Sequence, residues 1–381
     1  MQSVADLELA GKAAIVRADL NVPLDGDGRI ADASRLTQSC ATFRHVLDAG
    51  AGLAILSHLG RPKEGEPDPK LSLAPVAAWL AQELGIAVPL TQLADSKRPA
   101  PGEAILLENT RFNKGEKANA AELAQAYAKL GDVFVMDAFA SAHRSEASTV
   151  ALAACAGAKC AGLLLAREVD ALQRALARPE RPVAVVIGGA KVSSKLQVLE
   201  KLAELADHVV VGGGIANTFL LAQGLECGKS LAEPDMTDDC KRLLERHGDK
   251  FLLPEDVVVA PSFDAEAGEA KDAGAIGPQD MVLDLGPRSA AAAAELAGGA
   301  RTVIWNGALG VFENPAFSAA TRRLAEAVAA GDGYSLAGGG ETLAAINRFG
   351  VAGGISYLST GGGAFLEFAE GRELPGIAAL G

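Results

Sequence analysis

Short apolar runs alternate with segments of helical periodicity along the whole chain. In the first half, runs rich in Val, Ile and Leu predict β-strands at residues 13–18, 53–57, 104–107 and 133–136. In the second half, similar runs predict strands at residues 183–187, 208–211, 302–305, 334–337 and 355–360. Strands that alternate with helices are typical of a parallel sheet covered by helices on its faces. The sequence therefore predicts an α/β protein built from doubly wound, Rossmann-like parallel sheets.

Length and helical pattern predict how these sheets are divided. A chain of 381 residues exceeds the size at which one core usually stops growing, so two domains are expected. The segment 163–178 has apolar positions at helical spacing and is followed by Pro179 and Pro182, which indicates a helix that joins the domains. A second apolar segment, residues 150–166, is alanine-rich and contains Lys159, which favours a packed helix over a membrane span.

Charge and cysteine content limit the partners. The net charge of −13 argues against a nucleic acid or a membrane surface as the main partner, so an anionic ligand needs a local cluster of cations. The five cysteines are odd in number and match no zinc spacing, which predicts reduced thiols in a cytoplasmic protein. The N-terminal residues lack the basic start and apolar stretch of a signal peptide.

Polar side chains follow each strand predicted in the first half, where ligands bind in open parallel sheets. Guanidinium groups pair bidentately with phosphate and carboxylate, so these side chains predict a site for a small molecule with several negative charges. The dipole of a helix makes a cation unfavourable in its first turn. Arg35 is expected in such a first turn, because Asp32 is the expected N-cap. Besides Arg35, the residues are Asp19, Asn21, His58, Gly60, Arg61, Asn109, Arg111, Asp137, His143 and Arg144.

The stretch 183–202 combines a strand, a glycine turn, two lysines and a helix. Lys191 and Lys195 are four residues apart, so both are expected on one face at the start of that helix. A helix N-terminus repels cations unless an anion is bound there, so the pair indicates a phosphate site; a turn with solvated lysines is the alternative. The segment does not match GxxxxGK[ST], which excludes a Walker A loop.

Glycine clusters follow the later strands and repeat the strand, glycine and helix order. Glycine lets backbone N–H groups approach phosphate, so four clusters together with the two lysines predict a nucleotide-binding edge. A nicotinamide-dependent dehydrogenase is an alternative, although neither half has a clean GxGxxG with an acid about 20 residues later. The clusters are 212–214, 306–307, 338–340 and 361–363.

Nine motifs in series resemble those of the phosphoglycerate kinase family, in that family's order and almost from end to end. They are VRADLNVP (16–23), SHLGRP (57–62), LLENTRF (106–112), DAFASAHR (137–144), GGAKVSSKL (188–196), VGGGIANTF (211–219), WNGALGVFE (305–313), AGGGET (337–342) and STGGGAFLEF (359–368).

The resemblance implies a monomeric, cytoplasmic, glycolytic enzyme that moves a phosphoryl group between 1,3-bisphosphoglycerate and ADP with Mg²⁺. It implies a 3-phosphoglycerate-binding domain at residues 1–165, a helix and linker at 166–182, a nucleotide-binding domain at 183–360, and a segment at 361–381 that returns towards the first domain. Hinge closure near 178–182 and after residue 360 would bring the two substrates together.

The resemblance also assigns roles to single residues. Arg35, Lys191 and Lys195 would be catalytic, with Lys191 and Arg35 facing the phosphoryl group. The nucleotide would be held by Lys195, Asn306, Glu313, Gly339, Gly340, Glu341 and Thr342, with Glu313 on the ribose and Glu341 near the metal. The glycerate substrate would be held by Asp19, Asn21, Arg35, His58, Leu59, Gly60, Arg61, Arg111 and Arg144.

Three positions depart from the family pattern. Glu341 stands where the family uses Asp, which displaces the carboxylate by one methylene group. Ala308 replaces a common proline, and Ala140 replaces a glycine and is strained if that position needs a positive φ. The Glu341 change also motivates the alternative of a nucleotide-binding protein of the same fold that does not catalyse.

Overall fold

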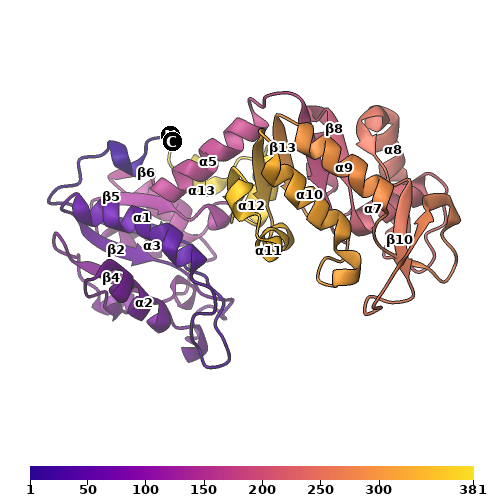
Figure 1. Ribbon diagram of the computed structural model, residues 1–381. Coiled ribbons are helices and arrows are strands. Elements are labelled where there is room, and N and C mark those ends of the chain that lie inside the picture. The colour runs from indigo at the N-terminus through magenta and orange to yellow at the C-terminus, as the bar shows by residue number, and fades with distance from the viewer. The chain divides into compact units, whose positions relative to one another are not determined.

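The computed structural model describes residues 1–381, and its contacts divide the chain into two compact units. Unit 1 contains Met1–Asp170 and Glu373–Gly381, and unit 2 contains Ala171–Arg372. Each unit contains one six-stranded parallel sheet with its own helices (Figure 1). The predicted α/β class with two Rossmann-like sheets is confirmed.

The sheet of unit 1 has the strand order β3-β4-β2-β1-β5-β6. Its central strands are buried on both faces, as expected for continuous apolar runs in a parallel sheet. The strands are β1 (Ala13–Ala18), β2 (Gly52–Leu56), β3 (Leu90–Thr91), β4 (Ala104–Leu107), β5 (Val133–Asp137) and β6 (Ala158–Ala161). The α-helices are α1 (Ser34–Asp48), α2 (Ala74–Leu84), α3 (Ala121–Ala128), α4 (Leu152–Cys155) and α13 (Pro375–Ala378).

The helix predicted at 150–166 is wrong. A π-helix at Ala147–Ala151 and the short α4 end at Cys155, and residues 158–161 then form β6 along the edge of the sheet. The next helix, α5 (Leu163–Leu176), contains the boundary between the two units. Its first turn is fixed in unit 1 because Asp137 Oδ1 accepts hydrogen bonds from the Leu164 and Leu165 amides at 2.9 and 3.0 Å.

The large sheet of unit 2 has the strand order β15-β14-β13-β7-β8-β9. The strands are β7 (Val183–Ile187), β8 (His208–Val211), β9 (Phe251–Leu252), β13 (Thr302–Asn306), β14 (Tyr334–Gly338) and β15 (Tyr357–Ser359). The helices are α6 (Leu196–Leu205), α7 (Gly213–Ala222), α8 (Thr237–His247), α9 (Pro287–Gly299), α10 (Ala319–Ala330), α11 (Gly340–Phe349) and α12 (Gly363–Ala369).

Unit 2 also contains a three-stranded antiparallel sheet that the sequence analysis did not predict. Its order is β11-β10-β12, with β10 at Asp256–Ala260, β11 at Glu269–Asp272 and β12 at Met281–Leu285. β11 is mostly exposed, so it lacks the apolar run by which a strand is recognised in a sequence. Apolar residues from β10 and β12 form small clusters with neighbouring segments, such as the Phe317 cluster.

All five cysteines are free thiols. Cys155 is exposed, whereas burial raises the pKa of Cys40 and Cys227 to about 11 and that of Cys160 and Cys240 to about 12. The four buried thiols therefore stay protonated at neutral pH and act as small apolar side chains. No helix of the structure is both long enough and apolar enough to cross a membrane.

Candidate functional site

Strands β4, β2, β1 and β5 are adjacent and parallel, so their carboxyl ends meet at one edge of the unit 1 sheet. The predicted cationic and polar residues follow these four strands. We call this group the anion site, and its members are Asp19, Asn21, Arg35, His58, Gly60, Arg61, Arg111 and Arg144.

An ion pair at the β1 end fixes Arg35. Its Nη1 lies 2.8 Å from Asp19 Oδ2 and also donates to the Asn21 carbonyl at 3.2 Å. The Asn21 side chain in turn accepts the Gly60 amide at 2.8 Å, which joins the β1 and β2 loops. The prediction that Asp32 is the N-cap is wrong, because α1 begins at Ser34 and Ala33 is its N-cap. Asp32, the residue before this N-cap, accepts a hydrogen bond from the Ser34 amide.

Arg111 and Arg144 converge on a carboxylate that the sequence analysis missed. Arg111 Nη2 donates to Glu146 Oε1 at 3.2 Å, and Arg144 Nη1 lies 4.0 Å from the same oxygen. Arg17, a fully buried residue of β1, approaches the other carboxylate oxygen at 3.8 Å. Burial lowers the pKa of Arg111 and Glu146 raises it, and a guanidinium group stays charged at neutral pH in either case.

His58 is almost fully buried within this group of cations. Its pKa lies well below 6.5, first because burial disfavours the charged ring and then because Arg17, Arg111, Arg144 and Arg35 repel a further positive charge. Arg17 Nη2 lies 3.2 Å from His58 Nδ1. The ring is therefore neutral at physiological pH.

The other predicted residues of unit 1 differ in how far they are exposed to solvent. Arg61 is exposed and forms no ion pair, so its guanidinium is free to reach a ligand. The Leu59 side chain is buried in the core, so only its backbone is available, and its carbonyl already accepts Asn109 Nδ2 at 2.8 Å. Asn109 also bonds to the Leu71 carbonyl at 2.9 Å, which makes it a support of the loop after β2.

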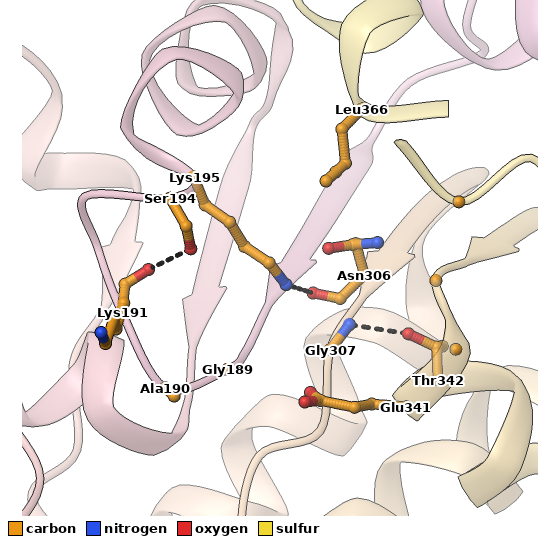
Figure 2. Close-up of a pocket in the computed structure, with 13 residues that line it drawn as sticks. Gly189, Ala190, Lys191, Ser194, Lys195, Asn306, Gly307, Glu341, Thr342 and Leu366 are labelled. Atoms are coloured by element: carbon orange, nitrogen blue, oxygen red, sulfur yellow. Dashed lines mark hydrogen bonds between the residues drawn. The ribbon is translucent and has the colours of Figure 1, made fainter. Parts of the chain in front are cut away.

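In unit 2, glycine turns after β7, β13 and β14 enclose a cavity of about 460 Å³ (Figure 2). We call it the phosphate cavity. Gly188 permits close contact between two of the turns, because a Cβ at this position would lie 1.8 Å from the Ala308 carbonyl oxygen. The lining residues are Gly189, Ala190, Lys191, Ser194, Lys195, Asn306, Gly307, Gly339, Gly340, Glu341, Thr342, Gly362 and Leu366.

The prediction that Lys191 and Lys195 share one face of a helix is wrong. Helix α6 begins at Leu196, Lys195 is its N-cap, and Lys191 lies in the preceding turn with its side chain exposed. Lys195 extends into the cavity, where Nζ lies 3.4 Å from the Asn306 carbonyl (Figure 2). Nζ also donates to the Gly188 carbonyl at 2.7 Å. Burial lowers the Lys195 pKa, and the charge of Glu341 opposes this shift.

Two side chains hold the turns of the phosphate cavity in place. Thr342 Oγ1 accepts the Gly307 amide at 2.7 Å, and Asn306 Nδ2 donates to the Gly338 carbonyl at 2.8 Å. The Asn306 Oδ1 atom is buried without a hydrogen-bond partner in the protein. A buried acceptor without a partner is costly, so a donor from a bound molecule or its hydration shell would stabilise it.

Glu341 lies in the first turn of α11, where the helix dipole favours a negative charge. It lines the phosphate cavity and also a second cavity of about 200 Å³. Glu313 lines only the second cavity and has an exposed side chain. The second cavity, which we call the apolar cavity, was not predicted because its lining residues Gly213, Gly214, Leu231, Phe263, Val311 and Phe312 come from separate loops and helices.

Glu341 is the one carboxylate that lines the phosphate cavity, and the chain contains no cluster of three or more His, Cys, Asp or Glu side chains able to hold a metal. Mg²⁺ is commonly held by one or two carboxylates together with substrate phosphates. The residues present therefore fit a magnesium ion that arrives with a nucleotide, and they do not fit a permanent metal centre.

Ala140 shows no strain of the kind expected for a residue that replaces glycine. It lies in a 3₁₀-helix at Phe139–Ser141, and Asn119 is the one residue other than glycine with a positive φ. Ala308 is buried, and its carbonyl lies against Gly188.

Three findings relate this chain to known proteins. The model of the phosphoglycerate kinase family matches residues 4–372. A phosphoglycerate kinase structure from Coxiella burnetii is similar, with 46% identity, a TM-score of 0.94, and coverage of 99% of this chain and 98% of that one. A phosphoglycerate kinase structure from Pyrococcus horikoshii OT3 has 31% identity, a TM-score of 0.84, and coverage of 100% of this chain and 98% of that one.

Proposed function

The chain belongs to the phosphoglycerate kinase family, and we propose that its anion site binds 3-phosphoglycerate while its phosphate and apolar cavities bind the nucleotide. As a member of this family, the protein is a glycolytic kinase that transfers a phosphoryl group reversibly between 1,3-bisphosphoglycerate and ADP. No finding supports the alternative of a protein that binds nucleotide without catalysis.

The positive charge of the anion site supports the assignment of 3-phosphoglycerate to it. 3-Phosphoglycerate bears a carboxylate and a phosphate, and Arg35, Arg61, Arg111 and Arg144 follow neighbouring strand ends in a chain of net charge −13. Bidentate guanidinium contacts suit both anionic groups. Asp19 holds Arg35 in place, Asn21 and His58 supply neutral side chains, and Leu59 and Gly60 belong to the loop that carries His58.

The groups that line the two cavities of unit 2 support the assignment of the nucleotide to them. The phosphate cavity offers glycine amides from residues 189, 339 and 340, the start of α11 and the Lys195 ammonium group, which together suit a polyphosphate. The apolar cavity offers Phe263, Val311 and Phe312 to a base, with the Glu313 carboxylate to accept hydrogen bonds from a ribose. Lys195, Asn306, Gly339, Gly340, Glu341 and Thr342 would hold the phosphates and their metal.

We assign the magnesium ion to Glu341 and the nucleotide phosphates. When bound, Mg²⁺ neutralises charge on the phosphate oxygens. Glu341 lines the phosphate cavity together with the three glycine turns, so its carboxylate is available to an ion bound to the phosphates.

Transfer itself requires little proton chemistry from the protein. The carboxylate of 3-phosphoglycerate is ionised at neutral pH, so it attacks phosphorus without a general base. Catalysis then depends on positioning two substrates and neutralising the charge of the transferred group. We assign the second task to Arg35 and Lys191, because Arg35 is held at the anion site and the exposed Lys191 ammonium lies at the rim of the phosphate cavity.

We further propose that the protein works as a cytoplasmic monomer whose two substrates meet by closure about residues 178–182 and the chain after residue 360. Direct transfer needs both substrates in one water-poor site, and each unit supplies the residues for one of them. Small-angle scattering tests closure: the radius of gyration falls when both ligands are present, and an unchanged value contradicts it. Light scattering during gel filtration gives the mass in solution.

A steady-state assay with 3-phosphoglycerate, ATP and a magnesium series tests the function directly, and absence of turnover at every magnesium concentration contradicts it. Lys191→Ala and Arg35→Ala each lower kcat by about 10²-fold or more while ADP affinity, measured by calorimetry, changes little. Lys201→Ala is the control, because Lys201 forms an exposed pair with Glu204 away from the cavities. Near-normal turnover in either test variant removes that residue from the transition state.

A further inference from the structure

A buried row of hydrogen bonds leads from Glu116 to the anion site. Ser148 Oγ lies 2.5 Å from Glu116 Oε1, Arg17 Nε lies 2.9 Å from Ser148 Oγ, and Arg17 Nη2 lies 3.2 Å from His58 Nδ1. Glu116, Ser148 and Arg17 are fully buried, and His58 is 5% exposed. The row is therefore shielded from bulk solvent, and neighbouring side chains in it pair with one another.

The chemistry of arginine fixes the direction of the two bonds that Arg17 makes in this row. A guanidinium group carries only donors, so Arg17 donates both to Ser148 Oγ and to His58 Nδ1. Ser148 then uses its single hydroxyl proton towards Glu116. Since His58 Nδ1 accepts, it carries no proton, and the neutral ring must carry its proton on Nε2.

Arg17 is itself held against rotation. Its Nη1 donates to the Ala18 carbonyl at 2.6 Å, and its Nη2 lies 3.8 Å from Glu146. All three guanidinium nitrogens thus have a partner, and a side chain fixed at each nitrogen offers one donor geometry to His58. The other ring tautomer, with a proton on Nδ1, would point an N–H group at an N–H group of Arg17.

The second ring nitrogen of His58 remains available. Nε2 has no hydrogen-bond partner in the protein and is not among the buried polar atoms that lack one, so it reaches the surface. His58 follows β2 at the edge where Asp19, Arg35 and Arg111 lie. A proton on Nε2 is thus a fixed donor towards any anion bound at that edge.

We propose that Arg17 is a positioning residue that fixes His58 as the neutral Nε2–H tautomer, so that His58 donates one hydrogen bond to the acidic substrate. Ser148 and Glu116 orient Arg17 for this purpose. The identity of the substrate rests on the proposed function, whereas the tautomer is a property of the free protein. The neutral ring gives the substrate a hydrogen bond of fixed direction without adding a charge, and the arginines supply the positive charge.

The tautomer is read from ¹⁵N-labelled histidine by long-range ¹H–¹⁵N correlation at neutral pH on the full chain without ligand. The protein has five histidines, so a His58→Gln sample identifies the signals. The expected spectrum shows an unprotonated Nδ1 and a protonated Nε2. A protonated Nδ1, or a doubly protonated ring at neutral pH, overturns the proposal whatever the enzyme assay shows.

Two variants test the role of Arg17. In Arg17→Met, which removes the donors, His58 is expected to show a mixture of tautomers, and the KM for 3-phosphoglycerate is expected to rise about ten-fold or more while the KM for ATP stays within about two-fold. Ser148→Ala, the milder change, is expected to give a smaller population of the Nδ1–H form. If Arg17→Met does not fold, Ser148→Ala alone tests whether the row of hydrogen bonds through Arg17 fixes the His58 tautomer.

Arg29→Met is the matched control, since Arg29 is an exposed arginine of unit 1 paired with Asp27. It is expected to leave the His58 spectrum and both KM values unchanged. A His58 spectrum that is unchanged in the folded Arg17 or Ser148 variant shows that Arg17 does not position the ring and overturns the proposal. Absence of turnover in the unmodified enzyme would instead contradict the proposed function and leave the tautomer measurement intact.

Discussion

Glu146→Gln removes the one negative charge shared by three arginines and leaves the shape of the side chain nearly unchanged. Glu146 Oε1 lies 3.2 Å from Arg111 and 4.0 Å from Arg144, and Oε2 lies 3.8 Å from Arg17. With an effective dielectric constant of about 20, each of these attractions is about 4–5 kcal/mol before desolvation is subtracted. Gln also points an NH₂ group, a donor, at one of the guanidinium groups.

The net cost of the change is smaller than the sum of these attractions, because removal of the carboxylate also removes its own desolvation penalty. Breaking a buried ion pair by removing one partner typically costs about 3–5 kcal/mol, and the side chains of Glu146, Arg111 and Arg17 are at most 5% exposed. We therefore expect Glu146→Gln to lower the free energy of unfolding by about 3–5 kcal/mol. Glu83→Gln, in an exposed pair with Arg44, is the matched control and should cost about 1 kcal/mol or less.

An anion should compensate for the missing carboxylate. In the variant, Arg17, Arg111 and Arg144 repel one another without a counter-charge, so 3-phosphoglycerate is expected to bind at least as tightly as in the wild type and to stabilise the variant more. A ligand at about 100 times its Kd contributes about 2.7 kcal/mol, so this recovery is large enough to measure.

Urea unfolding followed by circular dichroism gives the total change, and hydrogen exchange of peptides covering β1 and β5 reads unit 1 alone. The second measurement is needed because two units can unfold in separate steps. A loss below about 1 kcal/mol, equal to that of Glu83→Gln, would refute the view that Glu146 balances the arginines. Equal stabilisation of variant and wild type by 3-phosphoglycerate would refute the compensation.

Three further changes test other parts of the structure. Glu341→Asp is expected to leave kcat the same or raise it at saturating magnesium, and a large loss in the magnesium titration would show that the site has adapted to Glu. Gly188→Ala places a Cβ 1.8 Å from the Ala308 carbonyl oxygen, so calorimetry should show ADP affinity reduced about ten-fold or more. Burial raises the Asp284 pKa from 3.8 to about 7, so the wild type loses stability as the pH rises between these values. Asp284→Asn does not titrate, so its deficit in unfolding free energy should be smaller at about pH 8 than at about pH 5, and a constant deficit would contradict the shift.

The strands were predictable because their apolar runs end in glycine or polar residues. β1, β4, β7 and β8 have the bounds that the sequence predicts, and β2, β5, β13, β14 and β15 differ by one or two residues at an end. The helix expected at 150–166 fails because its alanine-rich composition suits a helix locally, whereas residues 158–161 gain hydrogen bonds by pairing with β5 at the sheet edge. Tertiary pairing outweighed a weak local preference there.

Lys195 shows why the start of a helix is harder to predict than its existence. The apolar spacing from Leu196 onwards is correct, but Val192 is buried in the preceding turn and extends the apparent pattern by one turn. The sequence therefore identifies both lysines but does not predict where they lie relative to the helix. The charge of Lys195 at the start of α6 is stabilised because its ammonium group bonds to the Gly188 and Asn306 carbonyls.

Arg17 and Glu146 could not be assigned from the sequence, although each lies in or beside a motif. Arg17 sits inside a strand, and its hydrogen-bond partner Ser148 is 131 positions away. A charged residue in an apolar run is a usable signal, because burying a charge requires a partner of opposite charge or several hydrogen bonds. The identity of that partner depends on the fold, so the sequence indicates that one exists without locating it.

The charge close to the anion site explains how a chain of net charge −13 binds an acidic substrate. Exposed charges farther away than about 10 Å are largely screened at physiological ionic strength, so the distant acidic residues contribute little at the strand ends. Near the site, Arg17, Arg111 and Arg144 share the single carboxylate of Glu146, and burial raises the Glu116 pKa to about 7, which keeps that nearby carboxyl partly protonated. The local balance is therefore positive even though the protein is acidic, and a second ionised carboxylate among these arginines would compete directly with the substrate.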